Sequence, residues 1–396
     1  MGTEARGAYR SGTEWARSGT ERRYVAVYTH LSDGFVRYML SVYPEAGELM
    51  SLTGIPAGSI NTSYRLGTST GEFFLRVGEN KQFADLIYEK NLLVFLEGEA
   101  GRLGGVATPR MVPNAARGYF FPVDASPTDV PPSEPKPARR AKYACLFEAL
   151  KGRDLAVFEV EPGHVEQVGA LLARAHLALR PFRGHRANPY GAPVLAAWLS
   201  NLKHAEVEQD LIARLDDALR WVLRHRRPLP RGVIHGDLFI NNTKWHRGRL
   251  DAVFDWEMAG RDHLALDVAI TLNAWCWRRE PSGGGAFDDE LASALLRGYQ
   301  SVRPLAPSER RGFHVECCLG ALRFTLSRIR DFGTQGEPAE VLSAFAPKDE
   351  RAADGADDGA AKAPHRDFLD YREYEARLRA LFDMGPKGLC DLTKLA

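Results

Sequence analysis

The chain has 396 residues, 44% of them hydrophobic, which is enough for two domains or for one large two-lobed domain with a sizeable core. Its 52 basic and 51 acidic residues leave a formal net charge of +1, so no overall charge draws it toward nucleic acid or an anionic membrane. Five cysteines without metal-binding spacing indicate a reduced, cytoplasmic setting, and no stretch reaches the roughly 18 uncharged apolar residues of a membrane span.

Two candidate strands follow an unpatterned N-terminal stretch. Residues 1–24 mix Gly, Ser, Thr, Arg and Glu without periodicity, so we expect a disordered extension. Residues 63–66 and 72–77 favour strands, and turns rich in Gly, Ser and Thr join them. This pattern predicts an antiparallel hairpin near the start of the folded chain.

A helix and a second hairpin are expected next. Residues 83–96 have helical spacing that stops at Gly98. The Pro-, Ser- and charge-rich stretch 122–142 is typical of a surface loop within a hairpin, and the apolar residues 143–147 that follow it favour a buried strand. The chain then reaches Gly152, a short connector suited to a hinge between two lobes.

Helical periodicity dominates the remainder of the chain. The predicted helices cover residues 164–179, 194–202, 206–223, 287–299, 309–332 and 371–382. Only residues 233–256 favour strands, with a hairpin turn at 247–248. The Ala-, Asp- and Gly-rich stretch 349–363 predicts a mobile insertion.

This order of elements predicts an α+β fold of two lobes. Residues 25–150 would form the smaller lobe, with a small antiparallel sheet and one main helix, and would supply a nucleotide clamp. Residues 151–396 would form a larger, mostly helical lobe that carries a catalytic loop and an acceptor site.

The segment from His235 to Asp267 carries the strongest chemical signal. His235-Gly-Asp237 is followed five residues later by Asn242, and Asp255 ends the next apolar strand. This is the catalytic-loop spacing of protein-kinase-like enzymes, which transfer the γ-phosphoryl group of ATP. An apolar strand precedes the loop and a hairpin follows it, as that architecture requires.

Phosphoryl transfer accounts for each residue type in this segment. Asp237 is the candidate base that orients an acceptor hydroxyl and takes its proton. Mg²⁺ prefers oxygen ligands, so Asn242 and Asp255 are the candidate metal ligands, with Asn241 as a rival to Asn242. His235 and Asp267 are expected to support the structure, by hydrogen bonds to the loop or by helix capping.

The N-terminal half should hold the nucleotide. Arg76 lies on the second predicted strand, where a cation would contact the α- and β-phosphates, and Glu89 on the next helix could hold it by an ion pair. The turn before these strands contains Gly54, Gly58, Asn61 and Ser63, which suit a phosphate-covering loop. A plain strand charge and an ordinary turn are the alternatives.

These segments resemble a known family. His235-Gly-Asp-Leu-Phe239 with Asn242, Phe254-Asp255 and Leu266-Asp-Val-Ala269 is similar to the signature of the aminoglycoside-phosphotransferase and choline-kinase-like fold, a relative of the protein kinases. Other strings are similar to the bacterial homoserine kinases of this fold: Ala26-Val-Tyr-Thr29, Ala175-His-Leu-Ala178, Arg186-Ala-Asn-Pro-Tyr-Gly191, the run 267–276 and Ala321-Leu-Arg-Phe324. The resemblance runs in order from about residue 25 to about residue 385.

The resemblance implies ATP- and Mg²⁺-dependent phosphorylation of the side-chain hydroxyl of L-homoserine, giving O-phosphohomoserine for threonine biosynthesis. It carries over Asp237 as the base, with Asn242 and Asp255 as the metal ligands. Two features depart from the homoserine kinase pattern. Arg76 stands where many members have threonine, and Trp256-Glu-Met-Ala-Gly260 replaces a more aromatic stretch.

Homoserine presents a carboxylate and an ammonium, so its site needs a forked arginine and oxygen acceptors. Arg323, Asn273 and Asn188 are the candidate substrate residues, and surface charge or core packing is the alternative reading of each. A related kinase for another amino alcohol, hydroxylated amino acid or aminoglycoside, and an inactive kinase-like binding module, remain competing hypotheses. The partner expected is a small molecule, with neither nucleic acid nor membrane involved.

Overall fold

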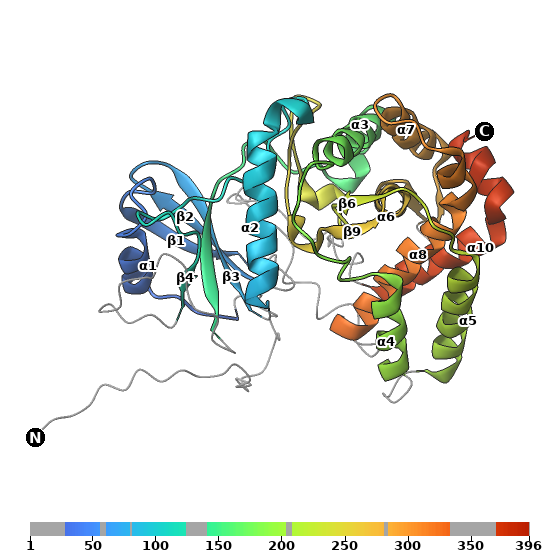
Figure 1. Cartoon of the computed structure of the whole chain (residues 1–396), viewed down its shortest axis with the longest axis horizontal. Coiled ribbons are helices and arrows are strands. Elements are labelled where there is room, and N and C mark those ends of the chain that lie inside the picture. The colour runs from blue at the N-terminus through green and yellow to red at the C-terminus, as the bar shows by residue number, and fades with distance from the viewer. Residues whose placement is uncertain are drawn as a thin grey trace, which may run out of the picture.

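The computed structural model describes residues 28–55, 61–79, 81–123, 141–202, 208–280, 284–332 and 370–395. A sheet-containing lobe and a mostly helical lobe lie side by side, with helix α2 (Phe83–Gly98) between them (Figure 1). The predicted α+β, bilobal fold class is confirmed. The extension at 1–24 and the insertion at 349–363 lie outside the described residues, and the lobe boundary near residue 150 stays a prediction.

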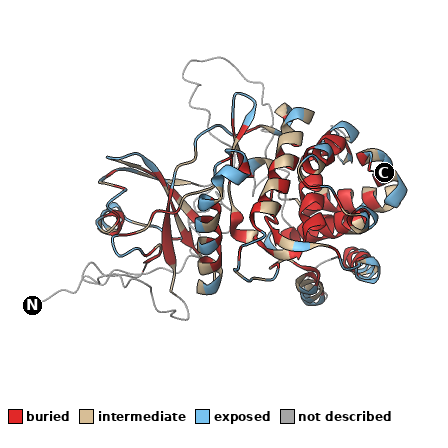
Figure 2. Cartoon of the chain, turned by 45° about the horizontal axis from the view of Figure 1, so that its top comes forward, coloured by how far each residue is buried: buried red, intermediate tan, exposed pale blue. Residues whose placement is uncertain are grey.

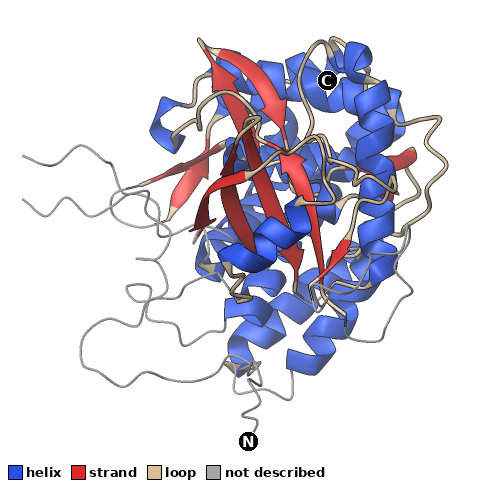
Figure 3. Ribbon diagram, turned by 90° about the vertical axis from the view of Figure 1, so that its left-hand side faces the viewer, coloured by secondary structure: helices blue, strands red, loops and turns tan. Residues whose placement is uncertain are grey.

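The smaller lobe is built on a five-stranded antiparallel sheet in the order β1-β2-β3-β5-β4 (Figure 3). Its strands are β1 (Leu49–Ile55), β2 (Thr62–Thr68), β3 (Glu72–Gly78), β4 (Phe121–Pro122) and β5 (Tyr143–Glu148). Both predicted hairpins are confirmed, because β2 pairs with β3 and β4 pairs with β5. Strand β1 and helix α1 (Asp33–Leu40) were not predicted.

Strand β5 is buried on both faces, which explains its continuous apolar sequence. Ala144 and Leu146 belong to the core beneath α1, whereas Tyr143, Cys145 and Phe147 belong to the larger core that α2 shares with the helical lobe. The alternation of side chains along one strand therefore joins the small sheet to the main core of the protein.

The larger lobe contains seven long helices among the described residues, and buried positions are concentrated where they meet (Figure 2). They are α3 (Pro162–Ala178), α4 (Ala192–Leu202), α5 (Gln209–His225), α6 (Leu264–Trp275), α7 (Asp289–Gln300), α8 (Pro307–Phe332) and α10 (Tyr371–Thr393). The six helices predicted by range are confirmed. Helices α3 and α7 cross closely, since a Cβ on Gly298 would lie 2.0 Å from the Glu166 carbonyl oxygen.

Helix α10 is longer than the sequence predicted. The prediction stopped at Phe382, but helical structure continues to Thr393 across a kink at Gly385, whose φ is 63° and ψ 179°. Pro386 comes directly after this glycine and starts the second helical segment, where its missing N–H costs no hydrogen bond. The Gly-Pro pair therefore redirects the helix instead of ending it.

Short strands and 3₁₀ turns position the segment singled out in the sequence. Strand β6 (Arg231–Ile234) pairs with β9 (Gly260–His263), and β7 (Thr243–His246) pairs with β8 (Arg249–Val253). The β7–β8 turn at 247–248 is the predicted one, with φ of 48° and 75° at its two residues. A further pair of short strands is β10 (Trp277–Arg279) and β11 (Gly285–Phe287). Within the described ranges, no helix is long and apolar enough to cross a membrane.

Candidate active site

The loop after β6 turns sharply at Gly236 to present Asp237. Gly236 has φ of 76°, and a Cβ there would lie 3.1 Å from the Met258 carbonyl oxygen, so both its conformation and its surroundings favour glycine. The 3₁₀ turn η3 (Ile240–Asn242) then brings Asn242 back against the loop. Asp237 and Asn242 are thus adjacent in space, five residues apart in the sequence.

The loop is braced by hydrogen bonds to its backbone. The carboxylate of Asp267 accepts from the backbone N–H of His235 at 2.7 Å and of Gly236 at 2.8 Å, and it lies 3.0 Å from Nε2 of His176. Asp267 lies inside the first turn of α6, whose N-cap position is occupied by His263. Of the two supporting roles expected, Asp267 therefore fits loop bracing and not capping. Burial alone would raise the pKa of Asp267, but the His176 hydrogen bond and charge lower it below its usual range.

His235 is also held between backbone groups. Its Nε2 lies 3.1 Å from the Phe254 carbonyl oxygen, and its Nδ1 accepts from the backbone N–H of Asp237 at 3.2 Å. Burial is the main reason that the pKa of His235 is lowered to about 4, so the ring is neutral near pH 7. These contacts fit the supporting role expected for this histidine.

Asp237 lies between an amide and a guanidinium. The Nδ2 of Asn242 donates to the Asp237 carbonyl oxygen at 2.8 Å and to its Oδ2 at 3.2 Å, while Nη1 of Arg323 is 3.7 Å from its Oδ1. Burial raises the pKa of Asp237 to about 6, although Arg323 acts in the opposite direction. A carboxyl group with this pKa is a proton acceptor near neutral pH.

Asp255 ends the hairpin in a left-handed conformation, with φ of 65° and ψ of 59°. Such a backbone is uncommon outside glycine and costs free energy, so surrounding structure must hold it. Burial, followed by the charges of Glu257 and Asp237, raises the pKa of Asp255 well above its ordinary range. At the start of η4 (Trp256–Met258), the half-buried Asp255 is therefore near two further acidic groups, the buried Glu257 and the half-buried Asp237.

The donor set fits a hard divalent cation. Asp255 offers a carboxylate that is short of positive neighbours, and Asn242 uses its amide nitrogen on Asp237, which leaves its amide oxygen as a donor. In the described part of the chain, no group of three or more His, Cys, Asp or Glu side chains could hold a metal. A two-residue oxygen set of this kind suits Mg²⁺, which takes other ligands from nucleotide phosphates and water.

The smaller lobe contributes a cluster of charged groups. Arg76 on β3 forms an ion pair with Glu89 on α2, with Nη2 and Oε2 2.7 Å apart. Glu257, from η4 of the larger lobe, lies in the same cluster: its Oε2 accepts from Asn61 at 2.6 Å and is 2.8 Å from Nζ of Lys81. The candidate nucleotide residues Arg76, Glu89 and Asn61 are therefore together.

Sequence reasoning missed Lys81 and Glu257. Glu257 joins residues of the smaller lobe that are up to 196 positions away, a relation that no local pattern encodes. Its one visible signal was an acidic residue in the stretch that departs from the family pattern. Of the phosphate-covering turn, Gly58 lies outside the described residues, whereas Gly54 is on β1 and Ser63 is on β2.

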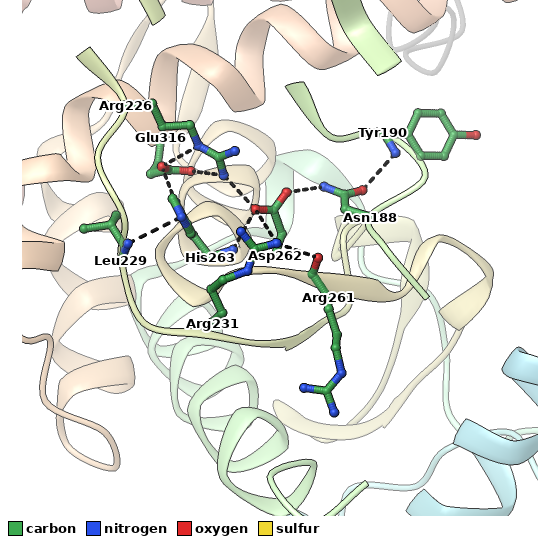
Figure 4. A network of polar contacts seen from close by, with 9 residues as sticks. All are labelled: Asn188, Tyr190, Arg226, Leu229, Arg231, Arg261, Asp262, His263 and Glu316. Carbon is green, nitrogen blue, oxygen red and sulfur yellow. Dashed lines mark hydrogen bonds and ion pairs between the residues drawn. The ribbon is translucent and has the colours of Figure 1, made fainter. Parts of the chain in front are cut away.

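The three candidate substrate residues have different surroundings. Arg323 on α8 is buried next to Asp237, and its Nη1 has no hydrogen-bond partner. Asn273 is buried within α6, and its Nδ2 donates to the carbonyl oxygens of Ala269 and Cys317. Asn188 belongs to a buried polar network and donates to Asp262 (Figure 4). Of these three residues, Arg323 is the one with an unpartnered donor close to Asp237.

Known proteins are similar to this chain over most of its length. A family model described as "Phosphotransferase enzyme family" matches residues 51–305. The homoserine kinase of Gluconacetobacter diazotrophicus is 35% identical over 326 residues, covering 78% of this chain and 89% of the relative. That of Caulobacter vibrioides is 32% identical over 342 residues, covering 82% and 94%.

Two solved structures share the fold at low sequence identity. An amicoumacin kinase has a TM-score of 0.60 at 15% identity, covering 78% of this chain and 89% of its own. The choline kinase of Cryptosporidium parvum has a TM-score of 0.53 at 12% identity, covering 87% of this chain and 92% of its own. At these identities the likeness concerns the fold alone.

Proposed function

Because the chain belongs to the phosphotransferase enzyme family, we propose that it is a homoserine kinase, which transfers the γ-phosphoryl group of ATP to the side-chain hydroxyl of L-homoserine. The product would be O-phosphohomoserine, a precursor of threonine. The relatives with this name are similar to the chain along 89% and 94% of their own length, which supports the proposal.

Asp237 is the proposed base. Its carboxylate is half-buried and is oriented by the Asn242 amide. Its raised pKa makes it an acceptor for the proton that the homoserine hydroxyl loses as the new P–O bond forms. His235 and Asp267 hold the loop in place and do not exchange protons with the substrate.

Asn242 and Asp255 are the residues proposed to hold Mg²⁺. The ion, when bound, would neutralise charge on the phosphates of ATP. Arg76 and Lys81 supply positive charge from the smaller lobe to the same phosphates, and Glu89 fixes the Arg76 side chain by its ion pair.

The position of Arg323 is the observation that supports homoserine as the acceptor. Its guanidinium is buried, keeps a free donor, and lies 3.7 Å from the proposed base. A buried unpaired donor is costly, so a ligand that bonds it is favoured. An acceptor with a hydroxyl and a carboxylate on one short chain could occupy both groups, and homoserine has this form.

An ADP-release assay with homoserine, threonine, serine, choline, ethanolamine and an aminoglycoside tests this assignment. We expect kcat/KM for homoserine to exceed that for choline, ethanolamine and the aminoglycoside by at least about tenfold, since these acceptors lack a carboxylate and forgo a charge-assisted bond to Arg323. Serine and threonine keep the carboxylate but carry the hydroxyl one carbon closer to it, so their kcat/KM should also be lower than that for homoserine. Equal or better turnover of another acceptor would replace homoserine with that acceptor. Absence of ADP release with every acceptor would favour an inactive binding module.

A further inference from the structure

The guanidinium of Arg323 lies against two aromatic rings. It lies 4.5 Å from the ring centroid of Tyr190 and 4.0 Å from that of Phe324. Stacking of this kind fixes the plane of an arginine while leaving its N–H donors available at the edge. The direction of those donors, toward Asp237 and its surroundings, therefore depends on where the Tyr190 ring lies.

Tyr190 is positioned by its neighbour Asn188. The Oδ1 of Asn188 accepts from the backbone N–H of Tyr190 at 2.9 Å, and its Nδ2 donates to Oδ2 of Asp262 at 2.9 Å. Both ends of the Asn188 amide are thus used within the protein, which leaves it poorly placed to bind substrate itself. A Cβ on Gly260 would lie 2.9 Å from the Asn188 Cα, so the loop rests directly on β9.

Asp262 is anchored in turn by buried charged groups (Figure 4). Its Oδ1 lies 2.8 Å from Nη2 of Arg226, and Arg226 also bonds both carboxylate oxygens of Glu316 at 2.9 and 3.1 Å. His263 adds a contact of 2.8 Å from its Nδ1 to Glu316. Asp262 is 3% exposed and Glu316 is 1% exposed, so solvent does not screen these ion pairs.

The contacts form a closed circuit on helix α8. Glu316 and Arg323 are seven residues apart on this helix, which is about two turns, so they project from one side of it. From Glu316 the circuit passes through Arg226, Asp262 and Asn188 to Tyr190, and Tyr190 returns to α8 by stacking on Arg323. The circuit therefore has six members: Glu316, Arg226, Asp262, Asn188, Tyr190 and Arg323.

We propose that Tyr190 is a specificity-determining residue, which sets the plane of Arg323 for the carboxylate of the acceptor, and that Asn188 and Asp262 are the positioning residues that fix Tyr190. This inference rests on the proposed function, since it takes Arg323 as the group that binds the acceptor carboxylate. It adds Tyr190, which contacts the arginine directly, and Asn188 and Asp262, which act through Tyr190.

The test measures kcat and separate KM values for homoserine and ATP in four variants and in the wild type. Tyr190→Ala removes the stacking ring and is expected to raise the homoserine KM about tenfold. Asn188→Ala is expected to raise it by a smaller factor, because the ring remains but is less well fixed. In both variants kcat and the ATP KM stay within about twofold of the wild type.

Tyr190→Phe is the conservative variant: it keeps the ring and loses only the hydroxyl contact to Arg330, so the homoserine KM should rise far less than in Tyr190→Ala. Arg311→Ala, at an exposed position of α8, is the control and should keep a wild-type homoserine KM. The melting temperature of each variant is recorded. If Tyr190→Ala does not fold, Tyr190→Leu takes its place.

Two negative results have separate meanings. No turnover of homoserine by the wild type overturns the proposed function and this inference with it. Turnover by the wild type with an unchanged homoserine KM in Tyr190→Ala and Asn188→Ala, or with an equal rise in the ATP KM, overturns this inference alone. A loss in Tyr190→Phe as large as that in Tyr190→Ala would also contradict it, because the ring is what acts on Arg323.

Discussion

The catalytic loop and the nucleotide cluster are held together in different ways. The loop takes its supports from one lobe, through backbone hydrogen bonds to Asp267 and His235. The cluster joins two lobes through side-chain ion pairs, with Glu257 of the larger lobe facing Arg76 and Lys81 of the smaller one. Damage to the loop should therefore lower kcat, whereas damage to the cluster should weaken nucleotide binding.

Asp237→Ala should have the largest effect, on the side of the loop. Loss of the proposed base is expected to lower kcat by about 10³-fold or more. Binding of MgATP, measured by calorimetry, should change by less than about threefold, because the cluster proposed to contact phosphate is intact. Retention of near-normal kcat would remove Asp237 from its proposed role, and a parallel loss of MgATP binding would show that the two regions are not separable.

Asp267→Asn should have an intermediate effect, again on the loop. The carboxylate accepts from two backbone N–H groups, but an amide has only one oxygen, so its NH₂ group would face a donor. We expect kcat to fall about ten- to a hundredfold and the melting temperature to drop, since a buried donor loses its partner. Asp251→Asn on β8 is the control, with both quantities unchanged. A wild-type kcat in Asp267→Asn would contradict loop bracing.

Arg76→Gln should have the smallest of the three effects, on the side of the cluster. It removes one charge-assisted contact to phosphate, so we expect the ATP KM to rise about tenfold while the homoserine KM stays within about twofold. Arg65→Gln, on the exposed face of the neighbouring strand β2, serves as the matched control. A fall in kcat with no change in the ATP KM would show that Arg76 contributes to the catalytic step and not to nucleotide binding.

The catalytic loop could be predicted because its information is local. His235, Asp237 and Asn242 lie in one short loop, so their spacing is visible in the local sequence. The hairpin that follows turns at two residues with positive φ. The α2 helix and the two hairpins of the smaller lobe were likewise predicted from periodicity and turn residues, which act over a few positions.

The remaining features depend on contacts between distant segments. Glu257 contacts Asn61 across 196 positions, and Arg226 contacts Glu316 across 90 positions. Contacts of this kind depend on how whole helices and strands pack against one another, and the hydrophobic periodicity of a single segment carries no information about that packing. The prediction for helix α10 ended too early. Gly385 and Pro386 are local signals for the end of a helix, but helical structure continues beyond them.

Phosphorus NMR of the wild-type reaction with ATP, Mg²⁺ and L-homoserine tests whether the chain transfers a phosphoryl group to homoserine, because it distinguishes transfer to the acceptor from hydrolysis of ATP. We expect ADP and one new phosphomonoester signal, coupled to the methylene protons next to the side-chain oxygen of homoserine. Inorganic phosphate as the only new product, or unchanged ATP, would contradict it.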